Sequence, residues 1–229
     1  MLNTYSNLRD ILRHDQRAVA KGTILKSEGD ESHSRLYVAE GWLAASKSLE
    51  DGDQQIIEFI LPGETYDPTA ADGKTSFLQI EALCDAVIAS IDKTAWALLL
   101  HEDQDLRNAE RERDLAAQAR QSERMLRLGQ ASAETRIAYV LIELCIRVSG
   151  GDAQCDIEFH VPLGQQQLGD FAGLSSVHVC RTLRRLNRAG VIRTGDHMDI
   201  LIQNLPALAE LAKVDLAALR NEITTGAAA

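Results

Sequence analysis

Residues 165–198 read QQQLGDFAGLSSVHVCRTLRRLNRAGVIRTGDHM, and the organisation of the whole chain is best understood from this stretch. Leu168 and Phe171 give its first seven residues one apolar face, which predicts a short helix that packs inward. Gly173 then supplies a turn, and Ser175 stands where the N-cap of a second helix is expected. The stretch therefore predicts two short helices joined by a tight turn.

The second predicted helix has one apolar and one strongly basic face. Its apolar face carries residues at helical spacing: Val179, Thr182, Leu183 and Leu186. Its basic residues are Arg181, Arg184, Arg185 and Arg188. No acidic residue stands between Ser175 and Ala189, in a chain whose net charge is −10. Because binding to phosphates needs positive charge without nearby carboxylates, this helix is predicted to contact DNA.

A β-hairpin is predicted directly after the second helix. Gly190 is placed to end the helix, and residues 191–193 and 198–202 read as two strands around a turn at Gly195-Asp196. Helix, turn, helix and hairpin in this order are typical of a winged helix-turn-helix. The alternative is a helical hairpin of an enzyme with its arginines in solvent, and the order of the signals favours DNA binding.

The acidity of the chain lies mainly in its front part. Residues 1–100 hold 9 basic and 16 acidic residues, whereas residues 130–229 hold 9 and 11. A negatively charged chain has little general attraction for nucleic acid, which argues against indiscriminate binding. DNA binding is then expected to depend on the arginine-rich helix, on dimer geometry and on the salt concentration.

Length and cysteine pattern narrow the class of protein further. The 229 residues suffice for two modest domains, and no apolar run approaches the ~20 residues of a membrane span. The N-terminus lacks the apolar core of a secretory signal, so a cytoplasmic location is expected. The cysteines form no C-x-x-C pair, and we expect no metal and no cofactor. Cys180 lies beside Arg181, and positive charge favours the reactive thiolate, so we hypothesise that oxidation of Cys180 perturbs DNA binding.

The front of the chain predicts a small β-domain. Residues 8–20 read as a polar helix, and apolar runs then alternate with turn signals about every 10–12 residues. These runs, predicted to be strands, are residues 22–25, 36–39, 42–44, 55–60 and 82–91. Such spacing suits a small barrel or jelly roll, in which glycines with positive φ form the tight corners.

Several of these segments resemble the Crp/Fnr family of bacterial transcription regulators. LSSVHVCRTLRRLNRAGVI (174–192) is similar to the recognition helix of that family. Three further segments resemble its cyclic-nucleotide-binding-type β-roll: KGTILKSEGD (21–30), LYVAEGWLAAS (36–46) and DGDQQIIEFILPGE (51–64). The resemblance implies an α+β fold with an N-terminal β-roll (jelly roll), a long dimerisation helix and a C-terminal winged helix-turn-helix.

The segment that grips the cyclic phosphate in nucleotide-binding relatives departs from the family pattern here. Such relatives carry an arginine with a neighbouring serine or threonine, whereas alignment backwards from Cys84 places Ser76 and Phe77 near these positions. A buried phosphate without a bidentate arginine is poorly compensated. We infer that cyclic AMP is not the ligand, and the sequence names no other effector.

The resemblance also implies which residues contact DNA. Base edges would be read by Ser175, Ser176, Val177, His178 and Arg181. Arg181 matches the arginine that family members direct at a guanine, whose O6 and N7 suit a guanidinium. Val177 stands where many relatives have a glutamate, which leaves the base preference there open. Phosphate contacts are expected from Gln165, Arg184, Arg185, Arg188, Arg193 and His197.

Residues 101–130 contain no proline and are predicted to form a long helix. The resemblance makes it the helix that pairs two subunits, with a solvated single helix as the alternative. A weak heptad-like seam supplies the expected interface: Leu106, Ala109, Arg113, Ala116, Arg120 and Leu126. A hinge is expected at residues 129–131. Ser132 is placed to cap the next helix, and residues 205–219 predict a short closing helix over 208–219.

Three domains are predicted: a cyclic-nucleotide-binding-like β-roll sensor domain (1–100), a dimerisation helix and hinge (101–130), and a winged helix-turn-helix (131–229). The expected function is a transcription regulator that binds a palindromic operator as a homodimer, with RNA polymerase as a candidate partner. Three alternatives stay open: a haem- or redox-sensing regulator of the same fold, with His33, Cys84 or His101 as iron ligands; a ligand-free front domain that serves as a dimer scaffold; and an enzyme. No H-x-x-x-H or H-E-x-x-H spacing supports catalysis, and no catalytic residue is assigned.

Overall fold

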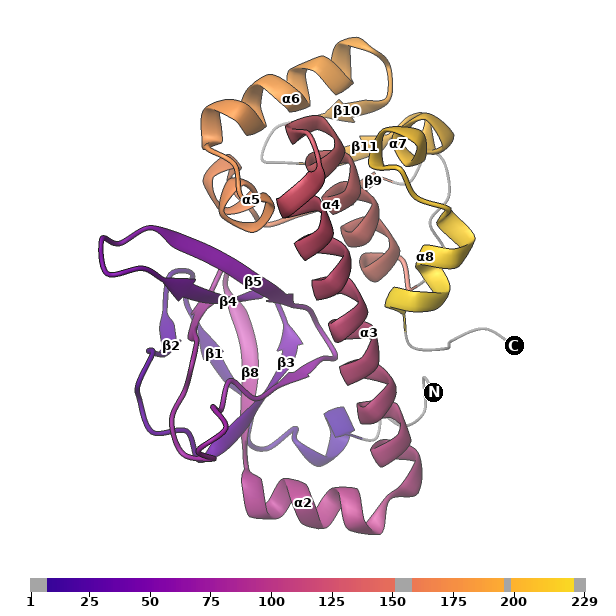
Figure 1. Cartoon of the computed structure of the whole chain (residues 1–229). Helices are drawn as coiled ribbons and strands as arrows, with labels where there is room; N and C mark the ends of the chain where they lie inside the picture. The colour runs from indigo at the N-terminus through magenta and orange to yellow at the C-terminus, as the bar shows by residue number, and fades with distance from the viewer. Residues whose placement is uncertain (1–7, 151–157, 196–198, 225–229) are drawn as a thin grey trace. The chain divides into compact units, whose positions relative to one another are not determined.

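The computed structural model describes residues 8–150, 158–195 and 199–224, and it divides the chain into two compact units, Met1–Glu110 and Arg111–Ala229. The described part of the N-terminal unit is built mainly from strands, and that of the C-terminal unit mainly from helices (Figure 1). The predicted α+β fold class is therefore confirmed. In the described ranges no helix is both long and apolar enough to cross a membrane.

Within its described residues, the N-terminal unit contains two antiparallel sheets of four strands each. The first has the order β1 (Arg17–Val19), β8 (Ala86–Asp92), β3 (Ser34–Glu40) and β6 (Thr65–Tyr66). The second has the order β2 (Ile24–Lys26), β7 (Gln79–Ala82), β4 (Leu43–Ser48) and β5 (Gln54–Ile60). The sheets form the β-roll that the sequence predicts.

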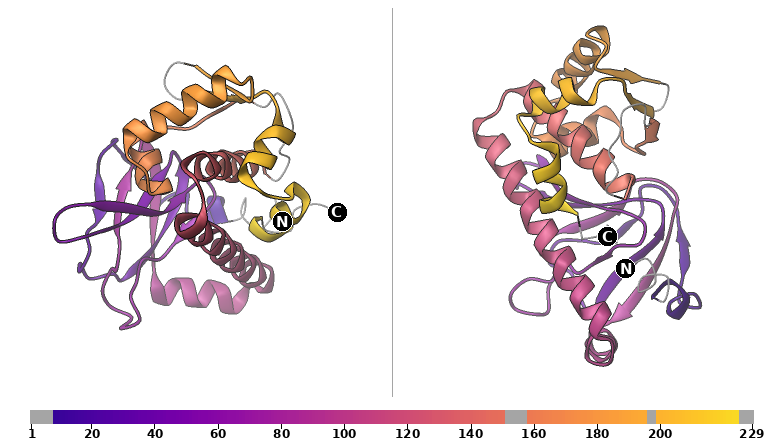
Figure 2. Two further views of the ribbon diagram at one scale, coloured as in Figure 1. Left: turned by 45° about the horizontal axis from the view of Figure 1, so that its top comes forward. Right: turned by 90° about the vertical axis from the view of Figure 1, so that its right-hand side faces the viewer.

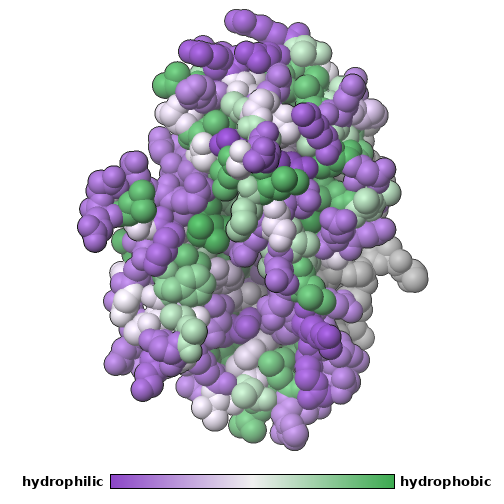
Figure 3. All heavy atoms as spheres, in the orientation of Figure 1, coloured by the Kyte–Doolittle hydropathy of each residue, from purple (hydrophilic) through white to green (hydrophobic). Residues whose placement is uncertain are grey.

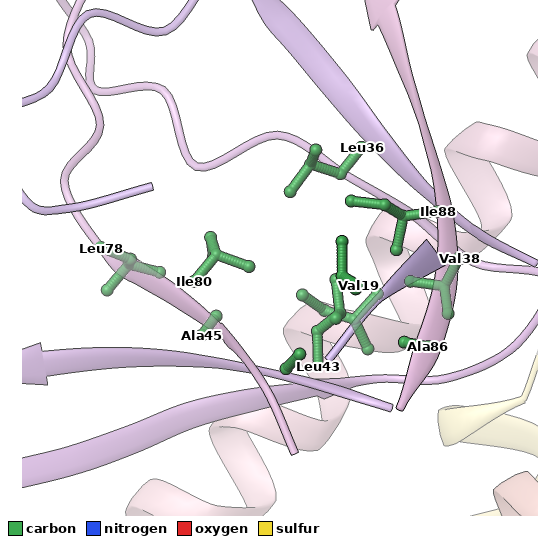
Figure 4. Close-up of a cluster of buried hydrophobic side chains, with 11 residues drawn as sticks. Val19, Leu36, Val38, Leu43, Ala45, Leu78, Ile80, Ala86 and Ile88 are labelled. Carbon is green, nitrogen blue, oxygen red and sulfur yellow. The ribbon is translucent and has the colours of Figure 1, made fainter. Parts of the chain in front are cut away.

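The apolar core of this unit lies between the two sheets. Because successive side chains of a strand point to opposite faces, Leu36 and Val38 of β3 point inward while Tyr37 and Ala39 point outward. The inward side chains from both sheets form one cluster, and Figure 4 shows the labelled ones converging on a shared interior. Its buried members are Val19, Leu36, Val38, Leu43, Ala45, Ile60, Leu78, Ile80, Ala82, Ala86 and Ile88.

The outer face of the first sheet is covered by helical residues. Tyr37 packs there with Leu8 and Leu12, with Trp96 of α2 (Lys93–Glu102), and with Leu106 of α3 (Gln104–Gln130). Helix α2 is a feature that the sequence analysis missed. The prediction of a helix over residues 8–20 is wrong for residues 17–19, which form strand β1 and pair with β8. Val19 of this strand packs into the core and is only 7% exposed.

The predicted glycine corners of the β-roll are confirmed. Gly29, Gly41, Gly52 and Gly63 all have positive φ, between 80° and 94°. Gly41 is constrained twice, because a Cβ atom there would also lie 2.6 Å from the carbonyl oxygen of Asp85. Only glycine combines that backbone conformation with so close a contact.

The C-terminal unit is organised around α4 (Ala133–Val148), whose residues 137–146 are all buried. Ser132 caps α4 as predicted, by accepting a hydrogen bond from the Thr135 amide. Helix α3 continues through Gly129 to Gln130, and the division between the two units falls upstream of the predicted hinge. The further helices are α5 (Gln165–Ala172), α6 (Ser176–Arg188), α7 (Leu205–Ala212) and α8 (Leu216–Ile223).

Three short strands complete the described part of this unit, in the order β10 (Ile192–Thr194), β11 (Asp199–Ile202) and β9 (Glu158–His160). Strands β10 and β11 are antiparallel, which confirms the predicted wing hairpin. The single closing helix predicted over residues 208–219 is wrong. Lys213 adopts the left-handed conformation, with φ of 55°, and Asp215 caps a separate helix.

The turn between α5 and α6 depends on two glycines. Gly173 ends α5 in the left-handed conformation, with φ of 65°. Gly169 lies inside α5, where its carbonyl oxygen accepts a hydrogen bond from the Leu174 amide at 2.9 Å. A Cβ atom on Gly169 would lie 2.3 Å from the Leu174 carbonyl oxygen. The chain therefore folds back over α5 only because position 169 has no side chain.

We expect Gly169→Ala to lower the free energy of unfolding of the C-terminal unit by about 2 kcal/mol, because overpacking outweighs the gain in helix propensity. Gly129→Ala is the matched control, since Gly129 is also helical and a Cβ atom there would meet nothing within 4 Å. That variant should keep or gain stability. Urea unfolding followed by circular dichroism measures both, and equal stability of the two variants would contradict the contact.

Candidate nucleic-acid interface

Helix α6 has one buried and one exposed face. Val179, Thr182, Leu183 and Leu186 are buried, as their helical spacing predicts. The hydroxyl of Ser175 caps the helix by accepting a hydrogen bond from the His178 amide at 3.4 Å, and it also lies 2.8 Å from His178 Nδ1. Figure 2 shows α6 at the periphery of the C-terminal unit in both views. The cap and the apolar face thus hold the helix with its basic side outward.

The basic face of α6 is open to solvent. Arg181, Arg184, Arg185 and Arg188 are all exposed. Arg185 forms an ion pair with Glu134 at 3.6 Å, whereas no carboxylate in the described ranges pairs with the other three. In Figure 3, hydrophilic side chains gather along the top of the view, where Figure 1 places α6. Three guanidinium groups are therefore available to an anionic partner.

The structure brings most of the predicted DNA-contacting residues to one place. A single open hollow is lined by Gln165, Ser176, Val177, Cys180, Arg181, Arg184 and Arg188. Val177 is 64% exposed, which is unusual for a valine and leaves its methyl groups free to touch a partner. Cys180 is half-buried in the same hollow, and its proposed oxidation remains a hypothesis.

Five predicted residues lie outside this hollow or outside the described residues, among them Arg185, which pairs with Glu134. Ser175 and His178 are exposed and bonded to each other at the start of α6. Arg193 is exposed on β10 of the wing. His197 lies outside the described residues.

One carboxyl group lies within the helix-turn-helix. Asp170 of α5 is half-buried, and burial raises its pKa, against the opposing effect of a hydrogen bond from Gln166 at 2.7 Å. Burial therefore favours the neutral form of Asp170.

Two further residues of this motif were not predicted from the sequence. Gly169 could have been found, because an isolated glycine in a helical pattern often marks a close contact. Arg136 has no local sequence signal.

Most residues of the predicted subunit seam are buried within the single chain. Leu106, Ala109, Ala116 and Arg120 are at most 5% exposed in the single chain, so their side chains are not on its surface. Leu106 belongs to the core of the N-terminal unit, and Arg120 donates a hydrogen bond to the carbonyl oxygen of Ile223. Arg113 is half-buried, and only Leu126 of the predicted set is an exposed apolar residue.

Another row of α3 residues reaches solvent. Leu115 and Leu126 are 56% and 57% exposed, and Ala119 and Ser122 lie between them at heptad spacing. Met125, beside Leu126, is 72% exposed. Helix α3 thus has small and apolar residues on two faces, and the chain's own core uses one of them.

Segment 67–77 lacks the arginine that would grip a cyclic phosphate. Within this segment, Ser76 is 2% exposed with its hydroxyl donating to the Leu78 carbonyl oxygen at 2.6 Å. Two nearby lysines serve internal bonds, since Lys26 Nζ lies 2.9 Å from Ser32 Oγ and Lys93 Nζ lies 2.6 Å from Thr69 Oγ1, whereas Lys74 of the segment itself is exposed.

Burial, followed by the charge of Lys93, lowers the pKa of Lys26, against the opposing charges of Asp67 and Asp30. The core cluster between the sheets is apolar, and the buried serines of this unit, Ser32, Ser46 and Ser76, carry no positive charge to pair with a phosphate. Segment 67–77 therefore offers no bidentate guanidinium to a cyclic phosphate.

The three candidate iron ligands have other surroundings. His33 is exposed and lies 3.0 Å from Glu31, Cys84 accepts a hydrogen bond from the Trp42 amide at 3.3 Å, and His101 is exposed on α2. Over residues 8–150, 158–195 and 199–224, no three histidine, cysteine, aspartate or glutamate residues come together as a metal site.

Two family models match the chain, in the order of its two units. The model of the cyclic nucleotide-binding domain matches residues 16–103, and that of the Crp-like helix-turn-helix domain matches residues 135–211. The two ranges together cover more than two thirds of the chain. The second range includes α5, the turn, α6 and the wing.

Whole proteins of similar sequence are transcription regulators. The nitrogen fixation regulation protein FixK of Rhizobium meliloti is 28% identical over 195 residues, which are 83% of this chain and 83% of that protein. A probable transcriptional activator of Rhizobium leguminosarum is 27% identical over 203 residues, covering 88% and 83%.

A solved structure shows the same fold. FixK2 of Bradyrhizobium japonicum matches with a TM-score of 0.76 and 22% identity, over 87% of this chain and 98% of that one. The match extends along both units, as the two family models do. With its β-roll, its helix-turn-helix and regulators as its relatives, this chain belongs to the Crp/Fnr family of DNA-binding transcription regulators.

Proposed function

We propose that this protein binds a palindromic operator as a homodimer and inserts α6 of each subunit into the major groove. The observation that carries the proposal is the exposed, acid-free face of α6, where Arg181, Arg184 and Arg188 surround one hollow. The major groove is wide enough for a helix, and each base pair presents a distinct pattern there. A two-fold pair of such helices reads two half-sites.

Arg181 is our main candidate for reading a base, because its fork can bond O6 and N7 of guanine together. Ser176 and Val177 line the same hollow, and the methyl groups of Val177 suit a thymine methyl. Ser175 holds Nδ1 of His178, which leaves Nε2 of that ring to face DNA. We propose phosphate contacts for the remaining predicted set: Gln165, Arg184, Arg185, Arg188, Arg193 and His197.

We propose that two copies pair along the exposed row of α3 rather than along the seam first predicted. Leu115, Ala119, Ser122 and Leu126 follow the 4-3-4 spacing of a coiled-coil seam, with Met125 at its edge. Exposed leucines at this spacing suit burial against the same face of a second copy, since a two-fold pair uses one patch twice.

We further propose that cyclic AMP does not control this regulator, because the β-roll lacks the chemistry to hold a cyclic phosphate. The proposed division is a β-roll domain of sensor type (1–100), a dimerisation helix (101–130) and a DNA-binding domain (131–229). Some relatives are named transcriptional activators, which supports contact with RNA polymerase as the mode of action. We place the protein in the cytoplasm, where bacterial DNA lies, and assign it no catalytic role.

Arg181→Ala should weaken binding to the operator by about 1–3 kcal/mol and relax the preference for one base in each half-site. Arg184→Ala is the matched control, an arginine of the same face that should lower affinity for all sequences equally. Selection from random DNA with the parent defines the operator, and titrations of operator and scrambled duplexes test the variants. Unchanged selectivity of Arg181→Ala would remove its role as a base reader.

Leu126→Glu should raise the dissociation constant of the dimer about tenfold or more, since it places a charge in an apolar seam. Leu98→Glu on α2 is the control, because Leu98 and Leu126 are equally exposed, at 57%. Sedimentation equilibrium of both variants measures the effect. A dimer that tolerates Leu126→Glu as well as Leu98→Glu would place the seam elsewhere.

Cyclic AMP should leave the melting temperature of the protein unchanged. The assay is sensitive enough to show binding, because a ligand at one hundred times its Kd would add about 2.7 kcal/mol to the free energy of unfolding. The selected operator duplex serves as the positive control and should raise the melting temperature of the same sample. Thermal melts over a range of nucleotide concentrations decide the matter, and a saturable rise with cyclic AMP would refute the proposal.

A further inference from the structure

Arg136 of α4 binds three backbone carbonyl groups from two separate segments. Its Nη2 donates to the Leu128 carbonyl oxygen at 2.7 Å, and its Nε donates to that of Ala131 at 3.1 Å. Its Nη1 donates to the Gly173 carbonyl oxygen at 3.2 Å. A guanidinium has a planar fork of donors that can serve several acceptors at once, whereas a lysine is a single point charge.

The acceptors of Arg136 lie at the end of α3 and at the turn before α6. Leu128 and Ala131 lie at the C-terminal end of α3, where carbonyl groups lack intrahelical partners and the helix dipole is negative. Gly173 forms the left-handed turn that ends α5, two residues before Ser175, the N-cap of α6. One side chain thus connects the end of α3 with the start of the arginine-rich helix.

Neighbouring arginines of α3 connect the same elements. Arg124 Nη1 lies 2.6 Å from Glu143 Oε1 of α4, and the two side chains are 7% and 0% exposed. The Arg124 guanidinium also lies 4.5 Å from the centre of the Phe171 ring of α5. Arg127 stacks over the Tyr139 ring at 3.9 Å and donates to the Ala212 carbonyl oxygen of α7 at 3.3 Å. The last turns of α3 are therefore packed as a part of the C-terminal unit.

We propose that Arg136 is a positioning residue for DNA binding. It fixes the orientation of α6 relative to the end of α3, so that pairing of two α3 helices sets the distance between two recognition helices. The inference rests on the proposed dimeric binding to a palindrome. Arg136 acts through the turn at Gly173, and the side chains that read DNA stay on α6 itself.

The experiment uses the full chain with Arg136→Met, which removes the fork but keeps much of its volume. Three duplexes are compared: the selected palindrome, the same palindrome with a lengthened or shortened spacer, and a duplex with one half-site scrambled. Arg136→Met should bind the palindrome about tenfold more weakly than the parent and lose the parent's preference for one spacer. Binding to the single half-site should stay at the parental level, since α6 itself is intact.

Two controls keep the test decisive. Arg107→Met removes an exposed arginine of α3 and should behave as the parent does on all three duplexes. Arg136→Lys, which keeps the charge, should restore stability but not spacer preference, and it replaces Arg136→Met if that variant does not fold.

The possible results separate the role of Arg136 from the proposed dimeric binding. Equal loss on the palindrome and on the half-site would show that Arg136 only supports the fold, and an unchanged spacer preference would show that it positions nothing; either result overturns this inference alone. A parent protein without any preference for the palindrome would overturn the inference together with the proposed dimeric function.

Discussion

Helix α6 has to be held firmly by one face while its other face stays uncovered, and the C-terminal unit is built around that constraint. Val179, Leu183 and Leu186 are buried, while the guanidinium groups three and four positions apart on the opposite face remain in solvent. Ser175 fixes where the helix begins, and the close approach of Leu174 to Gly169 fixes how it follows α5. A regulator needs this rigidity because base recognition depends on side chains placed within fractions of an ångström.

The shape of the N-terminal unit depends on its apolar core and its glycine corners. Alternation along β3 and β8 supplies an apolar core, and glycines with positive φ close the corners. Neither feature requires a phosphate. Ser76, near the position expected for the phosphate grip, donates its hydroxyl to the Leu78 carbonyl, and Lys26 and Lys93 hold Ser32 and Thr69. The roll is thus stabilised by its own side chains.

Local signals in the sequence predicted the functional motif well. The N-cap at Ser175, the apolar spacing from Val179 to Leu186 and the glycine at position 173 each act within a few residues, and the structure has them as expected. Features that depend on distant contacts were missed or wrong. Residues 17–19 form a strand because β8 pairs with them, and the seam on α3 was placed on a face that Leu106 and Arg120 use within their own chain. Arg136 could not be predicted, because its acceptors at Leu128 and Gly173 are 8 and 37 positions away.

The central claim is that two copies of α6 enter successive major-groove faces of one duplex. Hydroxyl-radical and methylation protection of the selected operator by the full chain measures this most directly. The account predicts two symmetric protected regions about 10 base pairs, or one helical turn, apart, with guanine N7 shielded once in each. A single protected region, or protection confined to the minor groove, would contradict it.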